Sequence, residues 1–226
     1  MRSCFVGVKT GWRLVLALLT LEAGSRLVAR AQDEPGISIG GFYERIQDNE
    51  VSDELRIFDY YGVRLQWRDA RWVTLYADLG LARGEWNHYE AEGSGLFGVG
   101  LYFWAWRAED LALPLDIGLH GAVYAGNLEW EKEGADGNGA NDSYRRFIGQ
   151  AVFRADMGQG VRPMVRVGVV RLSGEAPDGH GDEEWKKTRP SVGVGLEYAP
   201  HPHFSVGAEG NYIAGPGFAV GLAFWF

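Results

Sequence analysis

The sequence predicts an all-β chain folded as an antiparallel up-and-down β-barrel that crosses a lipid bilayer, with ten strands preferred and eight as the alternative. First, large apolar residues alternate with small or polar ones at a period of two, which is the period of a strand. Second, the clearest such segment, 216–226, has eleven residues, and a tilted strand needs about 9–11 residues to cross a bilayer. Third, short and long connections alternate along the chain, as in barrels with turns on one rim and loops on the other.

Ten segments show this alternation, and we expect each of them to be a strand. They are 36–46, 57–67, 72–82, 96–106, 113–126, 144–155, 161–173, 189–198, 204–212 and 216–226. In the last segment the large positions are Phe218, Val220, Leu222, Phe224 and Phe226, and the small residues Ala219, Gly221 and Ala223 lie between them. The large side chains suit a lipid-facing surface, and the small ones suit a crowded interior.

The connections between these segments fall into two sets. Those at 68–71, 107–112, 156–160 and 199–203 are short, whereas those at 47–56, 83–95, 127–143 and 174–188 are longer and acidic, and the one at 213–217 is brief. We expect the short turns to form one rim and the longer, flexible loops to form the other. An even number of strands then places both ends of the chain at the turn rim.

Aromatic residues gather at both ends of the predicted strands. Those expected near the turn rim are Trp67, Trp72, Trp104, Trp106, Phe153, Tyr198, Phe204, Phe224 and Phe226. Those expected near the loop rim are Tyr43, Tyr61, Trp86, Tyr144, Tyr212 and Phe218. Two aromatic belts separated by aliphatic residues are typical of the two membrane interfaces.

A removable secretory signal is expected at residues 1–31, followed by a single barrel domain at 32–226. Arg2, Lys9 and Arg13 precede or flank the start of a short apolar run at 14–21, and Ala29-Arg30-Ala31 fits an A-x-A cleavage site. The apolar run is shorter than the roughly 18–20 residues that a membrane-spanning helix needs.

Composition and charge narrow the class further. The single cysteine, Cys4, lies in the predicted signal, so no disulfide is expected. That signal holds five basic residues and one acidic residue, which leaves 17 basic and 29 acidic residues and a formal charge of −12. A chain of this charge is not expected to bind nucleic acid, because it would repel the phosphates.

The end of the chain carries a family resemblance. Phe226, preceded by apolar residues at alternate positions, resembles the terminal residue of the closing strand in bacterial outer-membrane β-barrels. Over 32–226 the chain is similar to the broad OmpA-like group of small outer-membrane β-barrel proteins, although members of that group typically have eight strands. The resemblance implies an outer-membrane location, contact with outer-membrane lipid and lipopolysaccharide, and recognition of the terminal strand by the barrel insertion machinery. We expect a monomer with a structural or surface-interaction role.

Periodicity alone does not decide which face of the sheet points inward, so a water-soluble sandwich or barrel with an apolar interior is the alternative. The polar set contains a few charges and nine glycines: Gly62, Gly80, Gly98, Gly118, Gly168, Gly193, Gly195, Gly207 and Gly221. Glycines that make room for paired charges are typical of a narrow lumen. The sequence therefore favours the membrane barrel.

The charged residues of the polar set are the candidate functional residues. Eight are expected to line the lumen, namely Arg64, Asp78, Asp116, His120, Arg154, Arg166, Glu197 and Glu209, and Glu44, Arg146 and Arg162 are also expected to face inward. Because acids and bases nearly balance, we expect ion pairs that fill most of a narrow lumen. The alternative is a small pore for water, ions or small solutes, lined by the same groups.

Catalysis is not expected. His203-Phe204-Ser205 resembles the His-x-Ser of outer-membrane lipid A deacylases. The residues that follow, Val206-Gly207-Ala208, depart from the pattern of that family, and no glutamate lies near Gly217. A lipid-modifying enzyme is therefore the third and weakest interpretation.

Acidic residues cluster in two of the predicted loops without the pattern of a metal site. Asp178, His180, Asp182, Glu183 and Glu184 crowd one loop, and Asp136, Asn138, Asn141 and Asp142 crowd another, without the ligand spacing of an EF-hand. We interpret both as solvated loops. Neither a metal ion nor a cofactor is expected.

Overall fold

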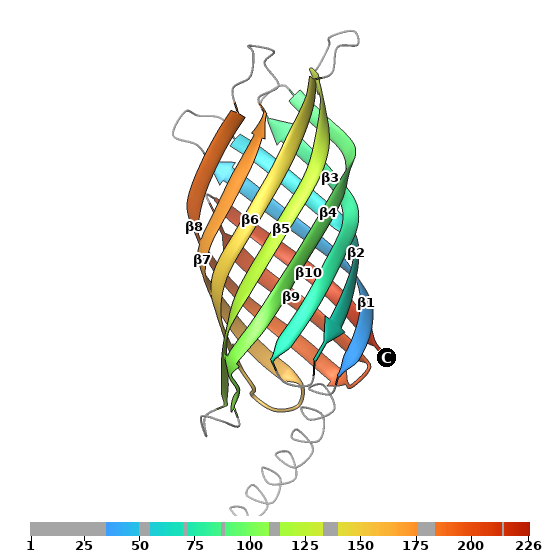
Figure 1. Cartoon of the computed structure of the whole chain (residues 1–226), viewed down its shortest axis with the longest axis vertical. Helices are drawn as coiled ribbons and strands as arrows, with labels where there is room; N and C mark the ends of the chain where they lie inside the picture. The colour runs from blue at the N-terminus through green and yellow to red at the C-terminus, as the bar shows by residue number, and fades with distance from the viewer. Residues whose placement is uncertain are drawn as a thin grey trace, which may run out of the picture.

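The computed structural model describes residues 35–49, 55–69, 72–86, 89–108, 114–132, 140–175, 184–213 and 215–226. In these residues ten antiparallel strands form one closed barrel (Figure 1). The strands are β1 (Gly36–Asn49), β2 (Leu55–Arg68), β3 (Val73–Trp86), β4 (Tyr89–Trp106), β5 (Leu115–Lys132), β6 (Ala140–Ala155), β7 (Val161–Glu175), β8 (Glu184–His201), β9 (Phe204–Tyr212) and β10 (Pro216–Trp225). The predicted ten-stranded barrel is confirmed, and the eight-stranded alternative is wrong. The predicted signal at 1–31 lies outside the described residues.

The first and last strands close the barrel. β1 pairs with β10 from Ser38 opposite Trp225 to Arg45 opposite Phe218, and it pairs with β2 on its other side. The Phe226 amide donates a hydrogen bond of 2.9 Å to a carbonyl of β1, so β1 begins and β10 ends at the turn rim (Figure 1). Because every strand has two neighbours, the sheet has no open edge, as a hydrocarbon environment requires.

Most strands extend further towards the loop rim than the sequence predicts. β3 continues to Trp86 rather than ending at residue 82, β5 continues to Lys132, and β8 begins at Glu184. The prediction of long loops at 47–56, 83–95, 127–143 and 174–188 is therefore wrong for much of each range. The described residues there continue the barrel wall. The sequence criterion required apolar residues on the outward face, and beyond the lipid that face becomes polar while strand pairing continues.

The outward face of the barrel is apolar along the lipid-spanning part of each strand. Leu79 on β3 is 64% exposed and Val194 on β8 is 61% exposed, whereas Asp78, next to Leu79, is fully buried. The predicted orientation, with aliphatic side chains outward and charges inward, is confirmed. The alternative of a soluble barrel with its apolar rows turned inward is wrong. No helix in the described part of the chain has the length and hydropathy to cross a bilayer.

Exposed aromatic side chains lie at both ends of the apolar face. They are Trp67, Trp72, Trp106, Phe153, Tyr198, Phe224 and Phe226 at the turn rim, and Tyr212 and Phe218 at the loop rim. Two predicted belt residues, Trp104 and Tyr144, instead point into the barrel and are 6% and 1% exposed. A register shift between Trp104 and Trp106 turns only the second of them outward. Tyr144 lies on the inward face because it alternates in phase with Arg146.

The short turn between β6 and β7 is determined by its own residues. The Gly158 amide donates a hydrogen bond of 2.8 Å to Asp156 Oδ1. Gly158, Gln159 and Gly160 have positive φ angles of 81°, 54° and 74°. A side chain on Gly160 would also meet the backbone carbonyl of Ala199, so the turn requires glycine at this position.

The interior has two parts along the barrel axis. The half next to the turn rim holds charged residues around a cavity, and the half next to the loop rim holds a cluster of buried apolar side chains. Glycines make room for large interior rings, because a Cβ at Gly98 would meet the Tyr124 ring and one at Gly100 would meet the Tyr76 ring. These close approaches explain why the polar set of alternate residues, which faces the interior, contains so many glycines.

Replacement of Leu79 by arginine is expected to lower the free energy of unfolding by about 2–4 kcal/mol, because it places a charge in the hydrocarbon near the middle of β3. Met157→Arg is the matched control, since Met157 lies in a turn and is 72% exposed. That control should change the free energy by less than about 0.5 kcal/mol. Urea unfolding in lipid vesicles, followed by tryptophan fluorescence, measures both. Equal and small effects would contradict a lipid-facing Leu79.

Candidate functional site in the barrel interior

Arg64 on β2 and Asp78 on β3 form a two-point ion pair inside the barrel. They lie opposite each other in the sheet, and Arg64 Nε and Nη2 donate to Asp78 Oδ1 and Oδ2, each at 2.7 Å. Tyr124 Oη donates to Asp78 Oδ2 at 3.0 Å. Asp78 is fully buried, and these bonds offset the cost of removing its charge from water.

Asp116 on β5 joins two arginines and a backbone amide. Arg154, its register partner on β6, donates to Asp116 Oδ2 from Nε at 3.1 Å and from Nη2 at 2.7 Å. The Ala108 amide donates to Oδ1 at 2.9 Å, and Arg107 Nε lies 3.5 Å from the same oxygen. The Arg154 guanidinium also lies 4.2 Å from the centroid of the Trp104 ring. These contacts tie the connection after β4 to the barrel wall.

Two further ion pairs join strands that are not neighbours in the sheet. Arg166 on β7 pairs with Glu209 on β9, with Nε to Oε1 at 3.1 Å and a second contact from Nη2 to Oε2. Arg146 on β6 donates from Nη2 to Glu44 Oε2 on β1 at 2.7 Å, so this bond crosses the lumen. Arg146 is 1% exposed, and its guanidinium lies 4.2 Å from the centroid of the Tyr124 ring.

His120 belongs to a chain of neutral hydrogen bonds within this network and is 3% exposed. Its Nε2 is 2.7 Å from Tyr76 Oη, and its Nδ1 is 3.1 Å from Gln150 Oε1. Gln150 Nε2 in turn donates to Ser191 Oγ at 3.0 Å. The ring stacks on Tyr102 with centroids 4.4 Å apart. Because an amide oxygen only accepts, the geometry fits an imidazole that donates from Nδ1 and accepts at Nε2.

A cavity of about 270 Å³ occupies the turn-side half of the interior. Among the residues that line it are six of the eight lumen residues named from the sequence: Arg64, His120, Arg154, Arg166, Glu197 and Glu209. The other two, Asp78 and Asp116, lie behind this surface and are paired with arginines that line it. On β1 and β10, the small residues Gly40, Ala219 and Gly221 line the cavity together with larger ones such as Phe42 and Trp225.

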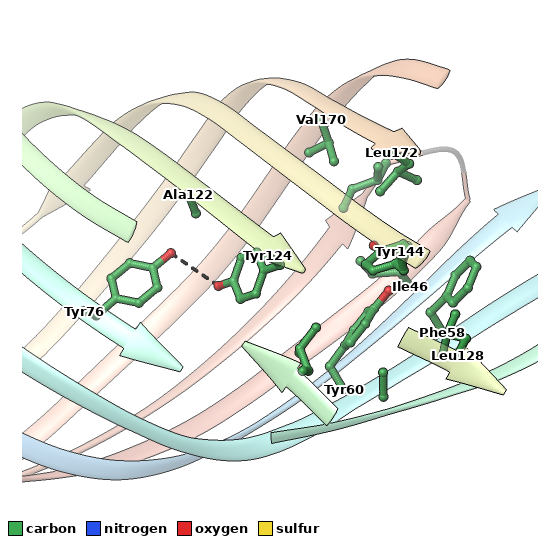
Figure 2. Packing of buried hydrophobic residues seen from close by; sticks show 13 residues of the cluster. Ile46, Phe58, Tyr60, Tyr76, Ala122, Tyr124, Leu128, Tyr144, Val170 and Leu172 are labelled. Atoms are coloured by element: carbon green, nitrogen blue, oxygen red, sulfur yellow. Dashed lines mark hydrogen bonds between the residues drawn. The ribbon is translucent and has the colours of Figure 1, made fainter. Parts of the chain in front are cut away.

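An apolar cluster that the sequence did not predict begins at Tyr76 and Tyr124, which also line the cavity, and continues into the loop-side half of the interior (Figure 2). It comprises Ile46, Phe58, Tyr60, Tyr76, Ala82, Leu96, Ala122, Tyr124, Leu128, Tyr144, Val170, Leu172 and Ile213. Phe58 and Tyr60 on β2 meet Tyr144 on β6, with ring centroids 5.5 and 5.8 Å apart. Since β2 and β6 are not neighbours in the sheet, these side chains pack against each other across the lumen.

Beside this cluster the outward residues are polar and the inward residues are apolar. The alternation in the sequence is therefore reversed there relative to the membrane-spanning part. On β7, Arg171 is exposed and Leu172 is buried, whereas Val169, nearer the membrane centre, faces outward. This change of phase is visible in the sequence and could have identified the cluster. Arg107 of the Asp116 site is different, because it lies in a connection outside the alternation, and no sequence signal identifies it.

The side chains of the two residues of the His-x-Ser pattern both contact Trp225. His203 Nδ1 donates to the Trp225 carbonyl at 3.0 Å, and Trp225 Nε1 lies 3.5 Å from Ser205 Oγ. His203 is exposed at the turn rim, while Ser205 faces the interior. Within the described residues, no group of three or more His, Cys, Asp or Glu side chains is placed to hold a metal ion. Asp136, Asn138 and residues 178–183 lie outside the described residues, as do the side chains of Asn141, Asp142 and Glu184.

Most of the charged side chains in the interior form ion pairs with one another. Asp78, Asp116, Glu44 and Glu209 each accept from at least one arginine. Ion pairs buried in this way hold strands in fixed relative positions, and two of them, Arg166 with Glu209 and Arg146 with Glu44, join strands that are not neighbours in the sheet. The arrangement can hold water or a polar solute in the cavity while the walls keep their own partners.

Comparison with known proteins gives distant similarities to membrane barrels. No protein-family model and no curated protein matches the sequence. The translocator domain of the autotransporter NalP from Neisseria meningitidis is 12% identical, with 96% of this chain and 98% of that chain covered and a TM-score of 0.44. The N-terminal β-barrel domain of Pseudomonas aeruginosa OprF is 15% identical, with 85% and 98% covered and a TM-score of 0.37. The attachment invasion locus protein Ail of Yersinia pestis is 17% identical, with 85% and 99% covered and a TM-score of 0.33.

The location of the chain follows from its own architecture. A closed antiparallel barrel whose outward face is apolar between two sets of aromatic side chains is the form in which strands cross the bacterial outer membrane. Each of the ten strands carries exposed apolar residues on its outward face. The chain is an outer-membrane β-barrel protein.

Asp78→Asn is expected to lower the free energy of unfolding by about 3 kcal/mol, because it leaves the Arg64 guanidinium inside the barrel without a carboxylate. A double variant with Arg64→Met and Asp78→Leu removes both charges and should lie within about 1 kcal/mol of the wild-type protein. Urea unfolding in lipid vesicles compares the three proteins. If the single and double variants lose the same stability, the two charges are not coupled in the way the geometry indicates.

Proposed function

We propose that the chain is a monomeric outer-membrane barrel with a structural or surface-interaction role, acidic extracellular loops, and a lumen that is mostly filled and does not conduct. The observation that carries this proposal is the contact of Phe58 and Tyr60 with Tyr144 across the loop-side half of the lumen. A barrel of this size is normally filled by its own side chains.

Burial of the side chains at this level supports a filled lumen. Tyr60, Tyr144 and Leu172 are each 1% exposed, and side chains packed this closely leave little room for water beside them. Towards the turn rim, the bond between Arg146 and Glu44 spans the lumen as a second obstacle. An ion that enters the cavity from the turn rim therefore meets first an ion pair and then a layer of packed rings.

The second candidate function is a small pore for water, ions or small solutes. The turn-side cavity of about 270 Å³ favours it, because charged groups line a space large enough for several waters. Conduction would also require the apolar cluster to rearrange. The current through the wild-type barrel therefore separates the two candidates.

We further propose that the chain is not an enzyme and uses no cofactor. A lipid-modifying enzyme that acts on the outer leaflet needs its catalytic groups at the extracellular rim. His203 is exposed at the turn rim and donates to the Trp225 carbonyl, and short turns face the periplasm in barrels of this type. A lipid-modifying activity is therefore the least supported of the three candidates.

The partners that we propose follow from the location. The apolar outward face contacts outer-membrane lipid, and its loop-side end contacts lipopolysaccharide. Phe226 is 80% exposed and ends the strand that the insertion machinery would recognise, as in the OmpA-like group that the sequence resembles. The connections at 50–54 and 176–183 are acidic in sequence, and we propose that they face the extracellular medium.

The wild-type protein in a planar lipid bilayer is expected to give no unitary conductance. Tyr60→Ala combined with Tyr144→Ala removes two rings that meet across the lumen and is expected to allow ion current, because water can then fill the space. Leu79→Ala is the matched control, since it shortens an outward side chain and leaves the interior unchanged. Single-channel recording at several voltages measures all three proteins.

Neutralisation of charges in the turn-side half of the lumen distinguishes between the two proposed functions, a filled barrel and a pore. Asp116→Asn and Arg166→Gln change groups of the turn-side half and leave the apolar cluster intact. Neither variant is expected to conduct. A wild-type current whose ion selectivity changes in these variants would contradict the filled lumen and establish the pore instead.

A further inference from the structure

One patch of the cavity wall carries no side chain larger than a methyl group. It consists of Gly207 on β9 and Ala219, Gly221 and Ala223 on β10, which all line the turn-side cavity and are called the β9–β10 patch below. A Cβ at Gly207 would meet a backbone oxygen at 3.8 Å, and one at Gly221 would meet another at 3.4 Å, which are ordinary contact distances. Unlike Gly98 and Gly100, these two glycines are therefore not required by the packing around them, and the sequence leaves the space in front of them open.

A carboxylate borders the β9–β10 patch on one side. Glu197 on β8 lies opposite Gly207 and lines the cavity. Among the residues that the structure describes, none forms a hydrogen bond or an ion pair with the Glu197 carboxylate. Its register partner on β7, Arg162, is buried, and no ion pair joins the two. The Glu197 carboxylate can therefore accept hydrogen bonds from a cationic group that enters the cavity.

A guanidinium group borders the β9–β10 patch on the other side. Arg64 on β2 lies opposite Gly40 on β1, and Gly40 lies opposite Ala223 of the patch. The hydrogen bonds of Arg64 to Asp78 and Tyr124 use Nε and Nη2, and its side chain is 27% exposed. Because a guanidinium carries five N–H donors, the Nη1 group of Arg64 can donate to an acceptor in the cavity while the pair with Asp78 stays intact.

The charges around the cavity balance. The described residues that line it include six arginines, namely Arg64, Arg68, Arg107, Arg146, Arg154 and Arg166, and four carboxylates, namely Glu44, Asp69, Glu197 and Glu209. Two more carboxylates, Asp78 and Asp116, lie behind its surface and pair with arginines that line it. A ligand with a net charge would leave that charge uncompensated in a confined space. A ligand that carries one charge of each sign would not.

The cavity is closed at one of its two ends. Arg68, the last residue of β2, and Asp69 line it, so it reaches the turn rim. At the other end, the bond between Arg146 and Glu44 and the apolar cluster close it. Its volume of about 270 Å³ lies just below the range of about 300–1,000 Å³ that is typical of sites for drug-sized molecules, which suits a solute of the size of an amino acid or a dipeptide.

We propose that the turn-side cavity binds a small zwitterion, a free amino acid or a dipeptide, against the β9–β10 patch. The ammonium group of the ligand donates to Glu197, its carboxylate accepts from Arg64 Nη1, and the rest of the molecule fills the space in front of Gly207 and Gly221. Charge-assisted hydrogen bonds at both ends select for a ligand with both groups. This assignment goes beyond the proposed structural role and does not rest on it.

The outer face of the barrel offers a matched control for each of two variants. Glu197→Gln removes the carboxylate of the site, and Glu85→Gln removes an exposed carboxylate from the outer face of β3. Gly207→Val fills the space in front of the β9–β10 patch. Gly149→Val adds the same side chain at an exposed position of β6, where a Cβ would meet nothing within 4 Å.

The test is saturation-transfer difference NMR of the protein in deuterated detergent micelles, with a mixture of the twenty amino acids and alanyl-alanine, followed by titration of the compound that binds most tightly. Glu197→Gln is expected to raise the Kd of this compound roughly tenfold, because it removes a charge-assisted hydrogen bond. Gly207→Val is expected to abolish saturable binding, and both controls should stay within twofold of the wild-type protein. The methyl ester of the compound lacks the carboxylate and its N-acetyl derivative lacks the ammonium group, so each should bind the wild-type protein roughly tenfold more weakly.

Any of four results would overturn the proposal. They are no saturable binding of any compound in the mixture, equal affinity of Glu197→Gln and the wild-type protein, equal affinity of Gly207→Val and Gly149→Val, and equal affinity of the wild-type protein for the compound and its methyl ester. Heat-modifiable migration on a detergent gel verifies that each variant is folded, and Gly221→Val replaces Gly207→Val if the latter is not. No current is measured, so a barrel that conducts would contradict the filled lumen without affecting this result.

Discussion

The closure of the sheet is the constraint on which the rest of the structure depends. In hydrocarbon an unpaired amide or carbonyl finds no water, so a sheet crosses a bilayer only when its first and last strands pair. β1 and β10 meet this requirement through eight residue pairs between Ser38–Arg45 and Phe218–Trp225. Once the barrel is closed, alternate residues must suit lipid on one side and a narrow interior on the other, and this requirement selects the aliphatic rows, the glycines and the paired charges.

The strands continue beyond the lipid, and there the requirement on their residues is different. Beyond the apolar face the strands continue, their outward residues become charged, and their inward residues become apolar, as Arg171 and Leu172 show. The loop-side end therefore resembles a water-soluble barrel with a packed core. This inversion has one consequence for function, since it fills the lumen with rings such as Tyr60 and Tyr144.

Much of the fold was accessible from the sequence because lipid imposes a strict period of two on the outward residues. The strand count, the orientation of each face and the inward direction of residues such as Asp78 follow from that rule. Partners across the lumen do not follow, because the pairing of Arg146 with Glu44 depends on the barrel diameter and on strands far apart in the chain. The alternation in the sequence also predicts the wrong face for Trp104, because a register shift beside this residue changes which side chains point outward.

Accessibility of spin labels along β3 tests most directly whether the aliphatic rows face lipid. Nitroxides would be attached one at a time to cysteines at Leu75, Ala77, Leu79 and Leu81, with Cys4 replaced by serine, in protein reconstituted in liposomes. The account predicts that oxygen collides with all four labels and that a water-soluble nickel complex is excluded, most strongly at Ala77 and Leu79. Free access of the nickel complex to all four labels would show that this face lies in water and would contradict the account.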